Sequence, residues 1–457
     1  MITAMPAPTA GRCALGIATG LLLATLASAV RAALAGRLDN LTELSPTAEG
    51  LVQLAFFVGV GLAGASYLRA LRLASGRPTR RLVGHALLIH LCAAPALPLT
   101  SNDLFSGLAY GRLLERGENP YRVGPEALPA DDVFKARVDP EWAAVPSRYG
   151  PLGLLVGRLA VAAGSVGSAV LVFKLLMALA GFAAVGLAAL AHRAIGGPDD
   201  GARGFVLVAW NPLLAWEVTG QAHVDGLVVV ATLGFLHFAF HGRERLAAAC
   251  LAAAVLAKAI LLPLLGLYLW HLLRGAPRRF AGAAGVVAVL LTLAVAPFGL
   301  WPVVAALPFA PEQLANSLAA AARFLAQGLA GETAARATAE AWSMLALAAL
   351  SASAAHAAWR TRTGTAAVRE SLVFLLLAQS VAMGWFMVWY PVVLLPLALA
   401  ADDELKHAVA LYTVLVPALY LPWDGAGVPI LLAHGFAAQH ALRALRLRPL
   451  ESASPWS

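Results

Sequence analysis

The sequence predicts an all-α polytopic integral membrane protein with about 12–14 transmembrane helices. Of its 457 residues, 60% are hydrophobic and 13% are charged, and the mean hydropathy is +0.75, whereas a soluble domain has about 25% charged residues. Apolar runs recur along the chain, for example at 51–68, 205–216, 280–296 and 371–389, and a helix needs roughly 20 apolar residues to cross a bilayer. These runs lack the alternating pattern of barrel strands, so helices must satisfy the backbone polar groups in lipid.

The charge of the chain is distributed as in a membrane protein. A net charge of +8 would suggest a nucleic-acid partner for a soluble protein. Here most lysines and arginines stand in short loops between apolar runs, which is typical of cytoplasmic loops. We therefore expect the lipid bilayer, and no nucleic acid, as a partner.

Arginine clusters predict the topology and the domain organisation. Five arginines between 69 and 81 place that loop in the cytoplasm, so the next span exits outward and residues 99–151 form an extracytoplasmic loop. A second outer loop is expected at 300–341. No segment is long and polar enough for a separate soluble domain, so residues 1–457 are expected to form one transmembrane domain. The first apolar run, 14–30, resembles a signal peptide, but because many spans follow we expect an uncleaved first helix.

The first outer loop is the most polar part of the chain, with 14 charged residues between 101 and 151. Asp103 follows two good N-cap residues, and the run 104–116 is compatible with a helix. On such a helix Asp103 and Tyr110 share a face, and Arg112 falls nearly opposite. Two interpretations fit Asp103 from the residues alone. It is either an ordinary first-turn acid favoured by the helix dipole, or a carboxylate kept ionised as a base must be.

Turn-forming and aromatic residues recur near the expected outer face. Asn119 and Tyr121 belong to one segment of turn formers, and Arg148 and Tyr149 belong to another. Turn chemistry alone explains both segments, and tyrosines are also common in the aromatic belts of membrane proteins. The aromatic segment 385–390 is either such a girdle or a surface that packs against a sugar or a lipid chain.

Glu217, His223 and Asp225 place three ionisable groups between two apolar runs. Ionisable groups near the membrane interior favour a functional role, while a solvated turn between helices is an equally good interpretation. A metal site built from these three residues is conceivable, but their spacing is not a known ligand pattern.

Lys258 and Pro263 interrupt the apolar segment 246–273. We expect two short helices here, with Lys258 at their apex near the outer leaflet, because helices broken by proline are tolerated where they line a cavity. The Lys258 side chain then either snorkels to the interface or binds an anion.

Nothing in the sequence indicates a cofactor. A GxGxxG string at 59–64 lies inside an apolar run, so it indicates close helix packing through small residues and not a dinucleotide site. Cys13, Cys92 and Cys250 lie in or beside apolar runs without metal-ligand spacing. We expect no metal site and no nucleotide cofactor; a divalent cation is compatible with these residues but not indicated by them.

Taken together, these motifs resemble the bacterial polyprenol-phosphate-mannose-dependent α-(1→6)-mannosyltransferases, which are GT-C-type membrane glycosyltransferases. The first block of the match has an ordered spacing and is fairly specific, whereas the later elements are shared across many GT-C families. The matching segments are 101–106, 110–112, 117–121, 124–125, 149–152 and 211–213. The chain departs from the family at Leu104-Phe105, where an aromatic or tyrosine pair is frequent, and at Val224, where the family often has asparagine.

The resemblance implies a GT-C-type bundle with extracytoplasmic loop helices in a bacterial inner (plasma) membrane. It implies an inverting transfer of a mannosyl or related hexosyl or pentosyl unit from a polyprenyl-phosphate donor to an acceptor hydroxyl on a lipid or glycan. The active site would face the extracytoplasmic side. No obligatory metal is inferred, because cationic side chains can offset the charge of the donor phosphate.

The resemblance also assigns roles to individual residues. Asp103 would be the general base, ionised because an aspartate has a reference pKa of about 3.9, and partial burial would raise its basicity. Residues expected to stabilise the donor phosphate electrostatically are Lys258 and an outer-loop arginine, Arg112 or Arg148. Residues expected to bind the sugar or the acceptor are Tyr110, Asn119, Tyr121, Tyr149, Glu217, His223 and Asp225.

A transporter or flippase for a lipid-linked or anionic substrate is the main alternative, since it too places charges beside membrane spans. Such proteins usually show paired repeats with broken helices in corresponding positions, and the sequence shows one broken helix without a partner. A scaffold protein is a third alternative, for which removal of Asp103 would change stability alone.

Overall fold

The computed structural model describes residues 7–75, 78–195, 202–305, 314–361, 363–421 and 428–446. All regular elements within these ranges are helices, and the described residues form no β-strand beyond an isolated bridge between Ala315 and Trp385. The predicted all-α fold is therefore confirmed.

Six of the described helices are long and apolar enough to cross a membrane. They are α1 (Ala7–Ala35), α2 (Pro46–Leu73), α7 (Val166–Ile195), α13 (Pro277–Val295), α15 (Leu318–Arg360) and α16 (Gly364–Leu377), the last extended by the π-helical turn η5 (Ala378–Ala382). The chain is thus a multi-span membrane protein. Shorter apolar helices are α6 (Pro151–Val161), α10 (Asp225–Ala239) and the pair η4 (Ala259–Leu261) and α12 (Leu262–Gly275).

The described part of the chain has fewer unbroken spanning helices than the 12–14 that we expected, because several apolar segments are split. One break falls at Asn211-Pro212, where proline cannot donate an intrahelical hydrogen bond, and another at Lys258, whose backbone is extended (φ −159°, ψ 128°). The elements next to these breaks are α8 (Arg203–Ala209), α9 (Pro212–Leu214), the π-helix η3 (Ala215–Gly220) and α11 (Glu244–Ala257).

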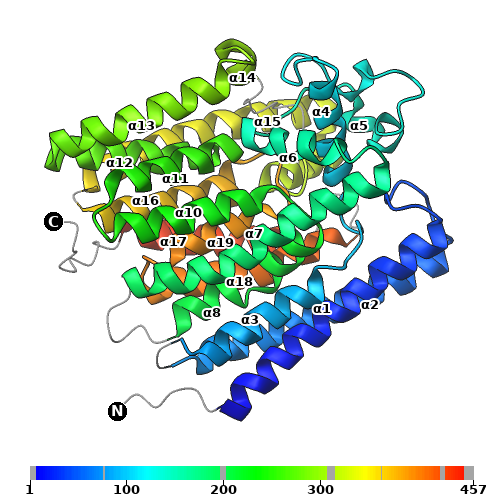
Figure 1. Ribbon diagram of the computed structural model, residues 1–457, viewed down its shortest axis with the longest axis horizontal. Coiled ribbons are helices and arrows are strands. Elements are labelled where there is room, and N and C mark those ends of the chain that lie inside the picture. The colour runs from blue at the N-terminus through cyan, green and yellow to red at the C-terminus, as the bar shows by residue number, and fades with distance from the viewer. Residues whose placement is uncertain are drawn as a thin grey trace.

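The long helices run side by side in one bundle, with α1 and α2 along one edge and α13 along the opposite edge (Figure 1). One hydrophobic core runs through it, with members from Ala10 to Ala444. The remaining elements are α3 (Arg80–Ala93), α14 (Leu300–Ala305), η6 (Tyr390–Val393), α17 (Leu394–Ala398), α18 (Asp403–Leu415), η7 (Val416–Tyr420) and α19 (Val428–Arg446).

Residues 99–151, which we expect to be extracytoplasmic and call the outer loop, fold into short helices that gather at one end of the bundle (Figure 1). They are α4 (Asp103–Glu115), η1 (Pro125–Ala127), η2 (Lys135–Arg137) and α5 (Pro140–Ala143), and α6 follows them. Helices α4 and α6 pack backbone to backbone, since a Cβ atom on Gly111 would lie 2.4 Å from the carbonyl oxygen of Gly157. This contact seats α4 firmly at the end of the bundle.

The second expected outer loop, 300–341, is largely helical where it is described. Residues 300–305 form α14, and residues 318–341 belong to α15, which is interrupted at Gly331 (φ 83°). Residues 306–313 lie outside the described residues. This part of α15 combines alanine, arginine and glutamate, a composition that suits a helix as well as a polar loop. The assignment of 300–341 to the outer side stays a prediction.

The small-residue string at 59–64 brings α1 and α2 into close contact. A Cβ atom on Gly59 would lie 2.5 Å from the carbonyl oxygen of Gly20, and one on Gly20 would lie 2.3 Å from the carbonyl oxygen of Gly59. Only a hydrogen atom fits on either side of this crossing. The prediction that the string packs helices is confirmed.

Replacing Gly59 with alanine is therefore expected to destabilise the protein by about 1–3 kcal/mol, the usual cost of overpacking. The check is the melting temperature of the purified protein in detergent. Gly61→Ala is the matched control, because a Cβ atom at Gly61 meets nothing within 4 Å. Equal melting temperatures for the two variants would show that α1 and α2 can move apart to accommodate the extra methyl group without loss of stability, which would contradict the prediction.

Candidate active site

Asp103 is the first residue of α4, at the end of the bundle where the outer loop folds. The hydroxyl oxygen of Ser101 accepts a hydrogen bond from the Asp103 backbone N–H at 3.0 Å. Asn102 occupies the N-cap position without capping the helix. Its Oδ1 instead accepts a hydrogen bond from the backbone N–H of Asn40 at 3.1 Å, and so ties the α1–α2 connection to the start of α4.

A histidine lies between Asp103 and a second, buried carboxylate. Nδ1 of His223 is 3.6 Å from an Asp103 carboxylate oxygen, and its Nε2 is 3.3 Å from Glu217. The Asp103 side chain is 28% exposed, whereas those of His223 and Glu217 are 2% and 0% exposed. Tyr420 donates a hydrogen bond to the other Glu217 oxygen at 3.1 Å. The row thus runs from the surface inward, with Asp103 as its accessible end.

The backbone around His223 is irregular in a way that directs these side chains. Glu217 lies on the π-helix η3, and single π turns inside helices are frequent at functional sites. Ala222 has φ +66°, a left-handed conformation that costs energy for a residue other than glycine. The His223 ring then stacks on Trp389, with ring centroids 3.8 Å apart and an interplanar angle of 18°.

The charges of this row stabilise one another. Burial alone would raise the pKa of Asp103, but hydrogen bonding and charge attraction from His223 outweigh it, and the pKa lies below its usual range. Burial opposes protonation of His223, yet its contacts with Asp103 and Glu217 raise its pKa to about 9. Burial therefore acts on Asp103 in the expected direction, but the neighbouring histidine cation outweighs it, so that the expected net increase in basicity is wrong.

The His223 pKa predicts how stability depends on pH. Because the folded-state pKa of about 9 exceeds the reference value of about 6.5, protonated His223 stabilises the fold fully below about pH 6.5. That contribution declines as the pH rises and is lost above about pH 9. The difference in melting temperature between wild type and His223→Gln should follow this course. A difference that stays constant from pH 6 to pH 10 would contradict a charged His223.

Lys258 forms a second charged centre at the same end of the bundle. At the break between α11 and η4, its Nζ donates hydrogen bonds to both carboxylate oxygens of Asp225, at 2.9 and 3.2 Å. The same nitrogen lies 4.1 Å from the ring centroid of Tyr390, a cation–π contact. The side chains of Lys258 and Asp225 are 17% and 2% exposed. The expected break in the helix at Lys258 is present. Of the two interpretations of its side chain, binding of an anionic group fits, since the ammonium group pairs with the Asp225 carboxylate.

The end of the outer loop joins the two centres. The backbone N–H of Gly150 donates a hydrogen bond to the carbonyl oxygen of Ala257 at 3.0 Å, next to Lys258. A Cβ atom on Gly150 would lie 2.0 Å from the Leu256 carbonyl oxygen, so only glycine permits this docking. The preceding residue, Tyr149, hydrogen-bonds Asp103, while burial first and then the negative charge of Asp103 hold the Tyr149 pKa well above its usual value. Tyr149 therefore stays a neutral hydroxyl donor.

A cavity of about 250 Å³ opens in front of Asp103. Its walls combine the start of α4 with the loop around α5 and with the segment before η6. The lining residues are Asn40, Thr100, Ser101, Asn102, Asp103, Ser106, Asp139, Trp142, Asn316, Met387, Val388, Trp389 and Tyr420. Polar side chains, including the carboxylates of Asp103 and Asp139, together with tryptophan rings suit a hydroxyl-rich ligand such as a sugar, which offers apolar faces and many hydrogen-bonding groups.

Several predicted site residues serve mainly to build the outer loop. The Tyr110 hydroxyl donates to the carbonyl oxygen of Val145, and the Tyr121 hydroxyl donates to that of Tyr149, both at 2.8 Å. The Asn119 amide donates to the carbonyl oxygen of Phe298 at 2.8 Å. These contacts hold the loop that carries Tyr149 against α4 and the bundle.

The two outer-loop arginines differ in their surroundings. Arg112 forms ion pairs with Asp132 and Glu115, on the face of α4 away from the Asp103 row, as the helical spacing predicted. Arg148 is exposed, and its guanidinium lies 6.0 Å from the ring centroid of Trp142, which lines the cavity. Of the two, Arg148 stands beside the cavity.

No group of three or more His, Cys, Asp or Glu side chains is arranged to hold a metal ion in the described ranges. In particular, Asp225 is engaged with Lys258, while Glu217 and His223 contact each other. The conceivable ligand set of Glu217, His223 and Asp225 is thus divided between two charged centres.

Sequence reasoning did not anticipate four contributors to the site. Trp389 and Tyr390 were expected to be a girdle or a packing surface, and they stack on His223 and Lys258. Tyr420 carried no signal in the sequence, and Gln221 was not singled out. The side-chain oxygen of Gln221 accepts hydrogen bonds from the backbone N–H groups of residues 99 and 100, and its amide nitrogen donates one to the backbone carbonyl oxygen of Leu97. Gln221 thereby fixes the segment that leads into α4. Its position between Glu217 and His223 was the clue available.

Fold and site together define a multi-span membrane protein with a carboxylate–histidine centre at one end of its bundle. Residues 13–274 match the model of the family described as alpha-(1→6)-mannopyranosyltransferase, N-terminal domain. The match covers more than half of the chain, which therefore belongs to the alpha-(1→6)-mannopyranosyltransferase family, a family of glycosyltransferases. The resemblance predicted from the motifs is confirmed.

Individual relatives agree with this assignment. The chain is 31% identical over 176 residues to a probable alpha-(1→6)-mannopyranosyltransferase of Mycolicibacterium smegmatis, covering 36% of this chain and 30% of the relative. It is 29% identical over 262 residues to alpha-(1→6)-mannopyranosyltransferase A of Mycobacterium tuberculosis, covering 54% of this chain and 49% of the relative. The chain thus spans between about a third and a half of the length of these two relatives. No solved structure matches it significantly.

Proposed function

We propose that the protein is an inverting glycosyltransferase that moves a mannosyl unit from a polyprenyl-phosphate donor to an acceptor hydroxyl at the extracytoplasmic face. One observation carries the proposal. Asp103 is 28% exposed on the wall of the cavity, while the other carboxylates of the two charged centres, Glu217 and Asp225, are 0% and 2% exposed. Asp103 is the carboxylate of these centres that an acceptor hydroxyl can reach.

Asp103 acts as the general base on the acceptor. An acceptor hydroxyl in the cavity donates a hydrogen bond to the carboxylate, which is ionised at neutral pH because of His223. The hydroxyl oxygen attacks the anomeric carbon, and its proton passes to Asp103 as the new bond forms. The bond from the anomeric carbon to the phosphate oxygen breaks, and its electron pair leaves with the lipid phosphate. A single displacement of this kind inverts the anomeric configuration.

Lys258 stabilises the leaving phosphate. Its side chain is partly exposed and its ammonium group is oriented by Asp225 and the ring of Tyr390. The positive charge can therefore stabilise the negative charge that develops on the phosphate oxygen. Arg148, exposed beside Trp142, is the second cation proposed for the donor. Arg112 is a weaker candidate, because Asp132 and Glu115 already occupy its guanidinium.

The remaining site residues bind and orient the sugar and the acceptor. Tyr149 offers a neutral hydroxyl next to Asp103, while His223 and Glu217 hold the Asp103 carboxylate in place. Tyr110, Tyr121 and Asn119 keep the outer loop folded and present Tyr149. The aromatic rings of Trp142 and Trp389 on the cavity wall supply flat surfaces for the apolar face of a pyranose.

The proposed orientation places residues 99–151 outside a bacterial plasma membrane, within one transmembrane domain of residues 1–457. The arginines between 69 and 81 support this orientation, because cytoplasmic loops of membrane proteins carry an excess of lysine and arginine. The acceptor, a lipid or a glycan, would enter from the aqueous side, and the donor would arrive laterally through the bilayer.

The release of free polyprenyl phosphate tests this proposal. Membranes containing the protein are incubated with polyprenyl-phosphate mannose labelled in the lipid, with and without an acceptor extract from a bacterial cell envelope. We expect acceptor-dependent release of polyprenyl phosphate. Movement of intact donor across the membrane without cleavage would instead identify a transporter or flippase and contradict the proposal.

A further inference from the structure

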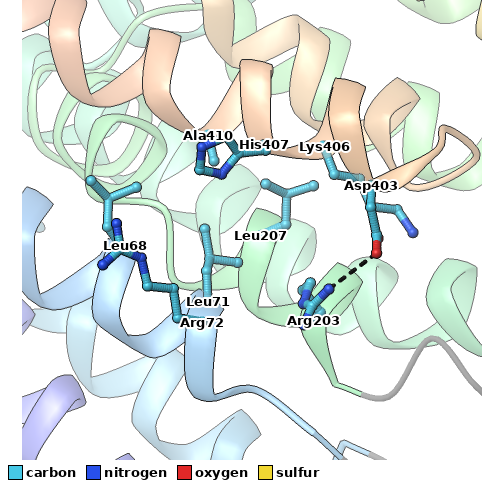
Figure 2. Close-up of a pocket in the computed structure, with 9 residues that line it drawn as sticks. All are labelled: Leu68, Leu71, Arg72, Arg203, Leu207, Asp403, Lys406, His407 and Ala410. Carbon is cyan, nitrogen blue, oxygen red and sulfur yellow. Dashed lines mark hydrogen bonds and ion pairs between the residues drawn. The ribbon is translucent and has the colours of Figure 1, made fainter.

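A second cavity lies at the far end of the bundle from Asp103. It has a volume of about 290 Å³ and is bordered by α2, α8 and α18 (Figure 2). Arg72, on its wall, lies 26 residues after Pro46, the first residue of α2, or roughly 39 Å along the helix at 1.5 Å per residue. The start of α2 follows the connection that Asn102 ties to α4, so α2 separates the two cavities by about the thickness of a bilayer.

The polar wall of this cavity is predominantly cationic. Arg72, Arg203 and Lys406 line it together with His407, and Asp403 is the one carboxylate among the described lining residues. Asp403 is paired with Arg203 at 3.2 Å, which leaves the lining with a net positive charge. Figure 2 shows these side chains coming from three different helices around one opening. The opening is therefore suited to an anion.

The rest of the wall is apolar. Leu68 and Leu71 of α2 and Leu207 of α8 lie beside the cations. A small soluble anion has no apolar part that could pack against these leucines. A lipid has both a charged headgroup for the cations and hydrocarbon chains for the leucines. Basic pockets between transmembrane helices bind the headgroups of anionic lipids in this way.

We propose that this cavity is a binding site for an anionic phospholipid, with the phosphate of the headgroup held by Arg72 and Arg203 and the acyl chains on Leu68, Leu71 and Leu207. The site is separate from the proposed transfer reaction. It would anchor the end of α2 to α8 and α18 in the membrane leaflet opposite to Asp103.

Native mass spectrometry of the full chain in a neutral detergent tests this inference, with phosphatidylglycerol as the probe, phosphatidylcholine as the neutral lipid and glycerol 3-phosphate as the chain-free phosphate. We expect saturable binding of one phosphatidylglycerol, and much weaker binding of the other two. Binding of phosphatidylcholine with equal affinity would overturn the role of the cations. Equally tight binding of glycerol 3-phosphate would overturn the assignment to a lipid.

Two exposed positions are expected to change the affinity in opposite directions. Arg72→Gln should weaken phosphatidylglycerol binding roughly fivefold, the contribution of one cation near an anionic headgroup. Asp403→Asn should strengthen it, because the substitution frees Arg203 and removes a repelling carboxylate. Arg69→Gln is the matched control, since Arg69 is exposed on the same helix end but does not line the cavity. An equal loss with Arg69→Gln, or no change with either of the other two, would reject the site.

Discussion

Asp103→Asn is expected to lower the rate of mannosyl transfer by about 10²–10⁴-fold, the usual contribution of a positioned general base. The amide of asparagine keeps the size of the side chain and its place at the start of α4, but it cannot accept the proton of the acceptor hydroxyl. Donor binding should be nearly unchanged, because Lys258 and Arg148 lie outside the Asp103 row. The measurement is transfer from polyprenyl-phosphate mannose at equal amounts of folded protein.

Asp139→Asn provides the control for this experiment. Asp139 lines the same cavity but serves as the cap of α5, where its side chain accepts a hydrogen bond from the backbone N–H of Glu141. Its replacement should leave most of the activity. Transfer that survives in Asp103→Asn would remove this residue from the chemistry and point to Asp225 or Glu217 as the base.

Lys258→Met is expected to have two large effects. Transfer should fall by about 10²–10³-fold, the loss typical of removing one group that stabilises developing negative charge. The protein should also lose about 3–5 kcal/mol of stability, because Asp225 would remain buried without its partner. Donor affinity, transfer rate and melting temperature measure these effects separately.

A double substitution separates the two roles of Lys258. In Lys258→Met/Asp225→Asn the uncompensated carboxylate is gone, so much of the stability should return. Transfer should stay low, because no cation faces the leaving phosphate. Recovery of transfer together with stability would show that Lys258 is only the structural counter-ion of Asp225.

The sequence patterns predicted the elements of this protein better than their assembly. Hydropathy predicted an all-helical membrane protein, and the N-cap and turn residues predicted a helix over 104–116, close to the observed α4 (Asp103–Glu115). The glycine spacing at 59–64 predicted a close helix crossing, and the structure shows that α1 is the partner of α2 there. These features depend on neighbours in the sequence, and local rules capture them.

Local rules could not predict which distant segments of the chain come together at the site. His223 contacts Asp103 across 120 positions, and Trp389 stacks on that histidine from a further part of the chain. A single π-helical turn and the left-handed backbone at Ala222 bring this about, and neither has a reliable signature in the residues. The lowered pKa of Asp103 is a consequence of this assembly, which is why burial alone suggested the opposite direction.

The different contacts of the three tyrosine hydroxyls also depend on the assembled fold. Tyr110, Tyr121 and Tyr149 were all expected to bind the sugar or the acceptor, Tyr110 from the helix face of Asp103 and the other two from segments of turn formers. In the structure the hydroxyls of Tyr110 and Tyr121 are committed to backbone carbonyls, while Tyr149 is next to Asp103. Of these three tyrosines, Tyr149 is therefore the one that we propose as a direct ligand contact.

The anomeric configuration of the product tests the central claim most directly. The purified protein is given polyprenyl-phosphate mannose of known configuration and an acceptor, and the glycosidic bond formed is analysed by NMR. Base catalysis by Asp103 in a single displacement predicts a mannosyl product of inverted configuration, formed together with free polyprenyl phosphate. A product of retained configuration would exclude the single in-line displacement and would contradict the assignment of Asp103 as a general base.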